Sequence, residues 1–264
     1  MIGILEFSFA RNALAGGLIM ALFLPLLSFF VVTRRLSFTG VGISHSAFGG
    51  LALGVLLGIN PVYGAIAISI LVAFVMAEAS RRGVPEDTTT GVLFAGTMAL
   101  GAVLLALAGG TRVDLWTYLF GNILSLSEFD LLLLGGVAAL NLGFLLLFLR
   151  KLLFSTFDPE LAEAHGVRTG LLNSALLFIL ALSVVACMRA VGVVLISGLL
   201  VFPGSIGARV SRSHKGGIIF SYLAGIIAII GGLGLSFWLN LPSGASVILV
   251  GTLIFLASLV FWRR

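Results

Sequence analysis

Charge is scarce in this chain, and its scarcity excludes an ordinary soluble domain. Only 9% of the 264 residues are charged and 60% are hydrophobic, whereas about a quarter of a soluble domain is charged. The 15 basic residues outnumber the 10 acidic ones, but they stand singly or in pairs between apolar runs, which is typical of membrane loops and not of a nucleic-acid-binding surface. The lone Cys187 excludes an intrachain disulfide. Glu6 precedes the first basic residue, so we expect no cleaved secretory leader.

The sequence also lacks the motifs of several enzyme classes. Neither lysine stands in a phosphate-binding G-x-x-x-x-G-K-[ST] loop, so the chain cannot hydrolyse ATP by that route. It contains no H-E-x-x-H motif and no intramembrane Asp pair, and we therefore expect no catalytic residue. The carboxylates of Glu78, Glu128 and Asp130 fall near the ends of apolar runs, whereas a secondary transporter normally needs such groups at mid-depth.

Long apolar runs are what the sequence has instead. About nine of them approach the ~20 residues that a membrane helix needs. Backbone amides in lipid must bond within the segment, and no run alternates with a period of two, so each run is predicted to be a helix. The predicted fold is an all-α polytopic bundle that forms a single transmembrane domain over residues 1–264. The predicted spans are residues 12–32, 43–58, 62–79, 90–108, 128–149, 171–188, 191–207, 217–238 and 244–262.

Basic residues divide unequally between the loops on the two sides of these spans. Twelve fall on one side, and only Arg11, Arg112 and Arg189 fall on the other. Since cytoplasmic loops carry the excess of Lys and Arg, the N-terminus is predicted to lie outside the cell membrane and the C-terminus in the cytoplasm. The outer segment 110–127 is too short and polar to span, which predicts an interfacial or re-entrant helix. Alternatively, its aromatic residues belong to the aromatic belt.

The run LRKLLFSTFDPELAEAHGVRTGLL, residues 149–172, is a charged island with helix signals. Asp158 or Thr156 can cap a helix that begins near Pro159, and Gly166 can end it after about two turns. A helix this short is unstable alone in water, so the pattern indicates docking to a partner on the cytoplasmic side. The alternative is a solvated loop that contains helix-forming residues.

His45 is the histidine that falls inside a predicted span, within the glycine-rich stretch GISHSAFGGLALG. An ionisable group at membrane depth costs about 2 kcal/mol or more, which makes His45 a candidate residue of a metal pathway. Ser44 beside it is a second candidate. The alternative is a neutral histidine that is hydrogen-bonded to a neighbouring helix among closely packed glycines.

Two further stretches carry candidate residues. Glu86 and Asp87 complement the positive end of the fourth span, where a threonine of residues 88–90 can act as the cap; beyond that role, they are candidates for a cytoplasmic metal exit. In GVVLISGLLVFPGSIGARV, Pro203 and the glycines around it, Gly204 included, interrupt an apolar helix. Such a break is typical either of a gate or hinge or of a simple packing kink.

Six motifs, in order along the chain from about Leu36 to Val250, resemble the permease subunits of the metal-ion ABC importers of the ABC-3 type. This family brings zinc, manganese or iron into bacterial and archaeal cells. The motifs are GISHSAFGGLALG, EDTTTGVLFAGTMALG, DLWTYLFGNIL, FDPELAEAHGV, VLISGLLVFPGSIGARV and LPSGASVIL.

The resemblance implies a type II importer, in which two copies of the permease form the pathway and two separate ATPase subunits bind below. It also implies an extracytoplasmic metal-binding protein that delivers the ion, with no permanently bound cofactor. Residues 157–166 resemble the coupling helix that docks into the ATPase. The residues expected to serve this coupling are Asp158, Pro159, Glu160, Ala162 and Gly166.

The sequence departs from the family pattern at Val41. Family members often have an acidic residue four positions before the histidine, where both side chains share one helical face. Loss of a carboxylate ligand favours zinc over manganese, because carboxylate-rich sites suit manganese better. We therefore expect zinc first as the transported metal, with manganese or iron next. Two rival functions remain open at the sequence level: an ABC permease for a bulkier metal chelate, such as a cobalamin or a siderophore, and a secondary transporter.

Overall fold

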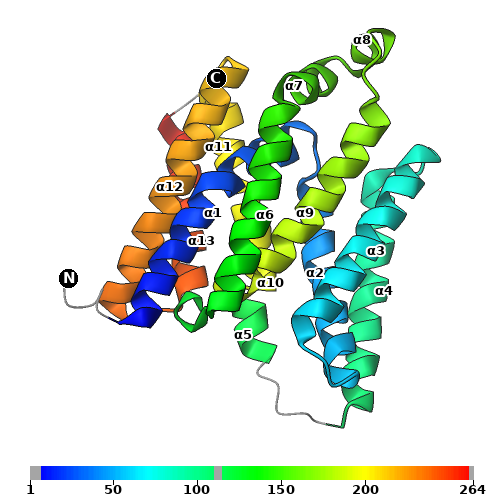
Figure 1. The fold of residues 1–264 in the computed structure, drawn as a ribbon. Coiled ribbons are helices and arrows are strands. Elements are labelled where there is room, and N and C mark those ends of the chain that lie inside the picture. Colours follow the sequence, from blue (N-terminus) through cyan, green and yellow to red (C-terminus); the bar gives the residue numbers. More distant parts are fainter. Residues whose placement is uncertain (1–6, 110–114, 262–264) are drawn as a thin grey trace. The chain divides into compact units, whose positions relative to one another are not determined.

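The computed structural model describes residues 7–109 and 115–261, and in these residues it contains helices and no strands (Figure 1). Nine helical segments of this part are long and apolar enough to span a membrane, which confirms the predicted all-α polytopic fold. They are α1 (Ser8–Thr33), α2 (Ser37–Leu56), α3 (Pro61–Arg81), α4 (Glu86–Leu107), α6 (Glu128–Leu147), α9 (Thr169–Val191), α10 (Val193–Leu199) with α11 (Phe202–Val210), α12 (His214–Leu239) and α13 (Ser243–Phe261).

Two of the predicted spans are informative when they are compared with the structure. The glycine-rich second span begins at Ser37 rather than at residue 43, because its small residues pack inside the protein instead of marking a loop. The seventh span is broken, as predicted: α10 ends at Leu199 and α11 begins at Phe202. Pro203 lies in the first turn of α11, where its missing N–H leaves no hydrogen bond unmade.

The chain forms two compact units. Unit 1 contains Met1–Arg35, Trp116–Leu142 and Ala186–Arg264, and unit 2 contains Leu36–Leu115 and Gly143–Val185. His45 belongs to unit 2, whereas Pro203 and Gly204 belong to unit 1. That both units act as one permease domain over residues 1–264 stays a prediction.

In unit 2, α2 packs against both α3 and α4 at distances that only glycine permits. A Cβ atom on Gly50 would lie 2.6 Å from the Cα atom of Ala65 and closer still to the carbonyl oxygen of Gly64. A Cβ atom on Gly49 would lie 2.6 Å from the carbonyl oxygen of Thr97 on α4. Backbone therefore meets backbone, which is the usual way for membrane helices to associate in the absence of a hydrophobic driving force between them.

Hydrogen bonds between side chains set the register of α2 against α4. Thr97 Oγ1 donates to Ser46 Oγ at 2.9 Å, and Thr90 Oγ1 contacts Thr39 Oγ1 at 3.5 Å, with a sequence separation of 51 in both pairs. The constant separation shows that the two helices run parallel. Hydroxyl pairs of this kind satisfy polar groups that would otherwise face lipid or apolar side chains.

Unit 1 is built on α12, which packs against α1, α11 and α13. Small residues again allow the approach: a Cβ atom on Gly204 of α11 would lie 2.5 Å from the carbonyl carbon of Ser28 on α1. The Gly204 N–H also donates to Ser28 Oγ at 2.8 Å. A Cβ atom on Gly225 of α12 would lie 2.5 Å from the ring of Pro25.

The outer segment forms two short helices in its described part, α5 (Leu115–Phe120) and the 3₁₀ turn η2 (Ile123–Ser125). Neither is long enough to span a bilayer, in agreement with the sequence. The interfacial or re-entrant location of residues 110–127 stays a prediction, and residues 110–114 lie outside the described residues.

The glycine contacts of α2 predict opposite effects of one methyl group at two positions of unit 2. We expect Gly64→Ala to lower the free energy of unfolding by about 1–3 kcal/mol, because the new Cβ would overlap the Gly50 carbonyl. Gly91→Ala on α4, where nothing lies within 4 Å of the added atom, serves as the control. It should be neutral or stabilising by about 0.5–1 kcal/mol. Thermal loss of helical circular dichroism in detergent measures both; equal midpoints would contradict the close contact.

Candidate metal pathway and coupling helix

His45 lies at the level of α2 where the helix faces α4. Its imidazole is partly exposed and meets the Phe94 ring edge to face, with ring centroids 5.0 Å apart and an interplanar angle of 83°. Ser44 is fully buried, and its hydroxyl donates to the Gly40 carbonyl at 2.7 Å, one turn back in the same helix. The Ser44 hydroxyl proton is thus used in a hydrogen bond within α2, whereas the imidazole of His45 is partly accessible.

The predicted acidic residues do not join His45 at one site. Glu86 and Asp87 lie in the first turn of α4, and at ~1.5 Å rise per residue Glu86 is about 12 Å along the axis from Phe94. Position 41, one turn before His45, is a valine. Over residues 7–109 and 118–260, no group of three or more His, Cys, Asp or Glu side chains could hold a metal ion. Among the described residues, His45 therefore does not belong to a cluster of three or more such side chains.

Glu86 instead connects three helices. Its Oε1 atom accepts a hydrogen bond from Asn173 Nδ2 of α9 at 3.1 Å and lies 3.5 Å from Ser80 Oγ near the end of α3. The prediction that a threonine of residues 88–90 caps α4 is wrong. The helix already begins at Glu86, so Thr89 lies inside it and donates to the Pro85 carbonyl at 3.3 Å.

The charged island contains a capped helix of the kind that the sequence predicts. In α8 (Pro159–Ala164), the Asp158 carboxylate accepts from the Leu161 N–H at 3.0 Å, whereas Thr156 donates to the Leu152 carbonyl instead of capping. Gly166 ends the turn with φ +78°, in the left-handed region that glycine tolerates best. The sequence missed α7 (Leu149–Phe157), a separate helix that precedes α8 and packs against it.

Most of α8 is exposed. Ala162 is its buried residue and anchors the helix, while Leu161 remains 46% exposed and Phe157, just before it, 64% exposed. The His165 ring packs at the C-terminal end of α8. Its Nδ1 atom lies 2.8 Å from the Leu161 carbonyl oxygen, and the ring makes an edge-to-face contact with Phe154 of α7. The segment is therefore a short helix and not a loop, and it presents two exposed apolar side chains beside Glu160.

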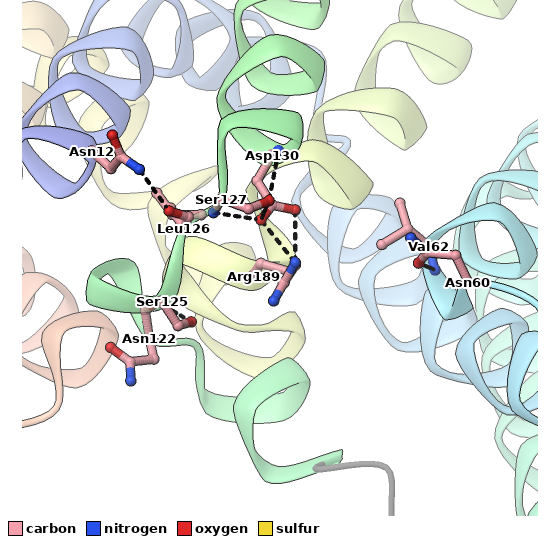
Figure 2. Close-up of polar contacts among 9 residues, drawn as sticks. All are labelled: Asn12, Asn60, Val62, Asn122, Ser125, Leu126, Ser127, Asp130 and Arg189. Carbon is pink, nitrogen blue, oxygen red and sulfur yellow. Dashed lines mark hydrogen bonds and ion pairs between the residues drawn. The ribbon is translucent and has the colours of Figure 1, made fainter. Parts of the chain in front are cut away.

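A partly buried ion pair in unit 1 was not identified as a site from the sequence. Figure 2 shows Arg189 Nη1 between both carboxylate oxygens of Asp130, at 2.8 and 3.0 Å. Ser127 donates its N–H and its hydroxyl to the same carboxylate, at 2.9 and 2.6 Å. The sequence signal was available, since Asp130 begins one span and Arg189 ends another. With these partners, the Asp130 carboxylate is committed to structure and is a poor candidate for a metal ligand.

The ion pair also holds the outer segment. The guanidinium carbon of Arg189 lies 5.7 Å from the centre of the Tyr118 ring, and the Asn122 N–H donates to the Arg189 carbonyl at 2.9 Å. Burial raises the pKa of the Tyr118 phenol, and the nearby Arg189 charge partly offsets this rise. Asn12 of α1 donates to the Leu126 carbonyl at 3.0 Å (Figure 2). Residues 118–127 are thereby fixed to two spans of unit 1.

The described residues form a multi-pass helical bundle with an exposed, capped helix between two of its candidate spans. Residues 6–262 match the ABC 3 transport family, and the chain belongs to that family.

Two curated relatives and one solved structure resemble the chain over nearly its whole length. The manganese transport system membrane protein MntC of Halalkalibacterium halodurans is 31% identical, over 98% of this chain and 89% of its own. The high-affinity zinc uptake system membrane protein ZnuB of Haemophilus influenzae is 32% identical, over 94% and 95%. The structure of PsaBC from Streptococcus pneumoniae in complex with Fab aligns with a TM-score of 0.84 and 30% identity, over 97% of this chain and 92% of that one.

The Asp130–Arg189 pair predicts a stability effect that the lone cysteine can report. Cys187 is fully buried, two residues before Arg189, and reacts with a thiol-specific dye only when this part of unit 1 opens. We expect Asp130→Asn to lower the free energy of opening by about 2 kcal/mol, because the Arg189 charge loses its partner. Glu128→Gln, an exposed carboxylate half a turn earlier, is the control. The same dye-labelling midpoint in both variants would show that the pair contributes nothing.

Proposed function

We propose that this chain is the permease subunit of an ATP-driven importer of a divalent transition metal, with zinc the first candidate and manganese and iron the next. The observation that carries the proposal is the match of residues 6–262 to the ABC 3 transport family. Two relatives that align over nearly the whole chain are named for manganese transport and zinc uptake. The metal is the cargo of the protein and not a resident cofactor.

His45 is the proposed metal contact of the pathway, with Ser44 beside it. A single accessible imidazole suits a transported ion, because a pathway must release what it binds. The absence of a carboxylate at Val41 and the ~12 Å between Glu86 and the level of Phe94 leave His45 without the oxygen ligands that manganese prefers. We therefore rank zinc first. Glu86 and Asp87 at the start of α4 remain candidates for the cytoplasmic exit, and Pro203 with Gly204 remain candidates for a gate.

The proposed motor contact is α8. A separate ATPase subunit, required because the chain has no phosphate-binding loop, would dock on the exposed surface around Glu160, Leu161 and Phe157. Two copies of the chain would form the pathway, and an extracytoplasmic metal-binding protein would deliver the ion. The distribution of basic residues, twelve against three, supports a cytoplasmic α8 and C-terminus with the N-terminus outside.

The docking role of α8 predicts that Glu160→Ala and Gly166→Ala uncouple ATP hydrolysis from transport. Glu160 is exposed on the docking surface, and an alanine at the φ of +78° found at Gly166 costs about 1–2 kcal/mol in backbone strain. We expect metal transported per ATP hydrolysed to fall about tenfold in vesicles that contain the permease, its ATPase and its binding protein. Glu128→Gln is the control. Wild-type coupling in both α8 variants would refute the docking role.

The pathway role of His45 predicts that His45→Ala lowers zinc uptake at least about tenfold while leaving assembly with the ATPase intact. His45→Gln, which keeps a polar side chain without an imidazole ligand, should be nearly as impaired. Radioactive zinc and manganese uptake in the same vesicles, together with the size of the purified complex, measures both effects. Unchanged uptake of both metals by His45→Ala would make the histidine structural, and faster manganese than zinc uptake by the wild type would reverse the order of the metals.

A further inference from the structure

A side-chain hydrogen bond joins two groups of helices in unit 2. One group is α2, α3 and α4, packed through glycines; the other is α7, α8 and the beginning of α9. Asn173, one turn into α9, donates from Nδ2 to Glu86 Oε1 at the first residue of α4, with a length of 3.1 Å. Both side chains are partly buried, so water competes less for this bond than at the open surface.

Apolar packing surrounds the same junction. Leu177, one turn after Asn173 on α9, is almost fully buried and lines a small pocket with Thr39 of α2, Met76 of α3 and Thr90 of α4. Glu86 also lines this pocket. Four helices therefore meet here, and the Asn173–Glu86 bond lies at their common edge.

The bond is close to α8 on one side. Thr169, the first residue of α9, donates its hydroxyl to the carboxylate of Glu163 in α8. Asn173 follows Thr169 by four residues and lies on the same face of α9. A displacement of α8 therefore carries the first turns of α9, and Asn173 with them.

On its other side the bond leads to His45. Glu86 begins α4, and α4 is held to α2 by the Thr90–Thr39 contact at 3.5 Å and the Thr97–Ser46 bond at 2.9 Å. Between these two contacts lies Phe94, whose ring meets the imidazole of His45. Because α2 and α4 touch backbone to backbone at Gly49, they shift together rather than slide past each other.

We propose that Asn173 is a positioning residue of the transport cycle: its hydrogen bond to Glu86 transmits the displacement of α8 to α4 and α2, and so to His45. The proposal rests on the proposed docking of an ATPase to α8 and goes beyond it, since it assigns the path inside the permease. It also changes the role of Glu86. The carboxylate acts as the acceptor of a mechanical contact and does not need its charge to guide an exiting metal ion.

Substitutions at both ends of the bond test the proposal. In vesicles that contain the full complex, Asn173→Ala and Glu86→Ala should each lower the zinc transported per ATP hydrolysed by about three- to tenfold while ATP hydrolysis persists. The double variant should be no worse than either single one, because both remove the same contact. Glu86→Gln keeps an oxygen that accepts from Asn173 and should restore the ratio. Ser174→Ala on α9 and Thr88→Ala on α4 are the matched controls.

Each outcome decides between two explanations of Glu86. Normal coupling in Asn173→Ala overturns the proposal, as does additive loss in the double variant. Failure of Glu86→Gln combined with normal coupling in Asn173→Ala would show that Glu86 acts through its charge on the exit path. The proposed function is tested separately in the same vesicles: a wild-type complex that transports without ATP hydrolysis, or Glu160→Ala with normal coupling, rejects the docking of α8, whereas failure at Asn173 alone leaves that docking in place.

Discussion

The close approach of α2 to α3 and α4 is the contact on which the candidate pathway depends. At Gly50 and Gly49 the backbones touch with no room for a methyl group, and hydroxyl pairs fix the register of α2 against α4. Lipid offers no hydrophobic force to press helices together, so this packing and these bonds hold the helices in place. The position of His45 against Phe94 follows from it, since any slip of α2 by one residue would carry the imidazole to another face.

Scarce charge makes each ionic or polar side chain informative. The Asp130 carboxylate pairs with Arg189 and accepts hydrogen bonds from Ser127. The Glu86 carboxylate accepts from Asn173, and the Asp158 carboxylate accepts from a backbone N–H of α8. Each of these carboxylates joins or caps helices. For Asp130, which is buried, this follows from the high cost of leaving a carboxylate unpaired in an apolar environment. The imidazole of His45 differs from them in that it meets an aromatic ring, that of Phe94.

Local signals in the sequence predicted the short elements unevenly. The cap of α8 was predictable because Asp158, Pro159 and Gly166 act on backbone atoms within a few residues of themselves. The start of α4 was not, since the threonines after Glu86 resemble caps equally well and only the interhelical contacts of Thr90 and Glu86 decide the boundary. The amphipathic α7 was merged with its neighbours because a span, a break at Phe148 and a short helix follow without any turn residue.

By itself, the sequence predicted a helical membrane protein, the approximate positions of the nine candidate spans that the described residues contain, and a short capped helix between two of them. These features depend on hydropathy and on contacts within a few residues, which the linear order contains. Only the tertiary structure decided which side chains meet: that Asp130 pairs with Arg189 across 59 positions, that Glu86 pairs with Asn173 across 87, and that the imidazole of His45 meets the ring of Phe94. Such pairs depend on helix rotation and register, which follow from packing between distant segments and leave no periodic mark on the sequence.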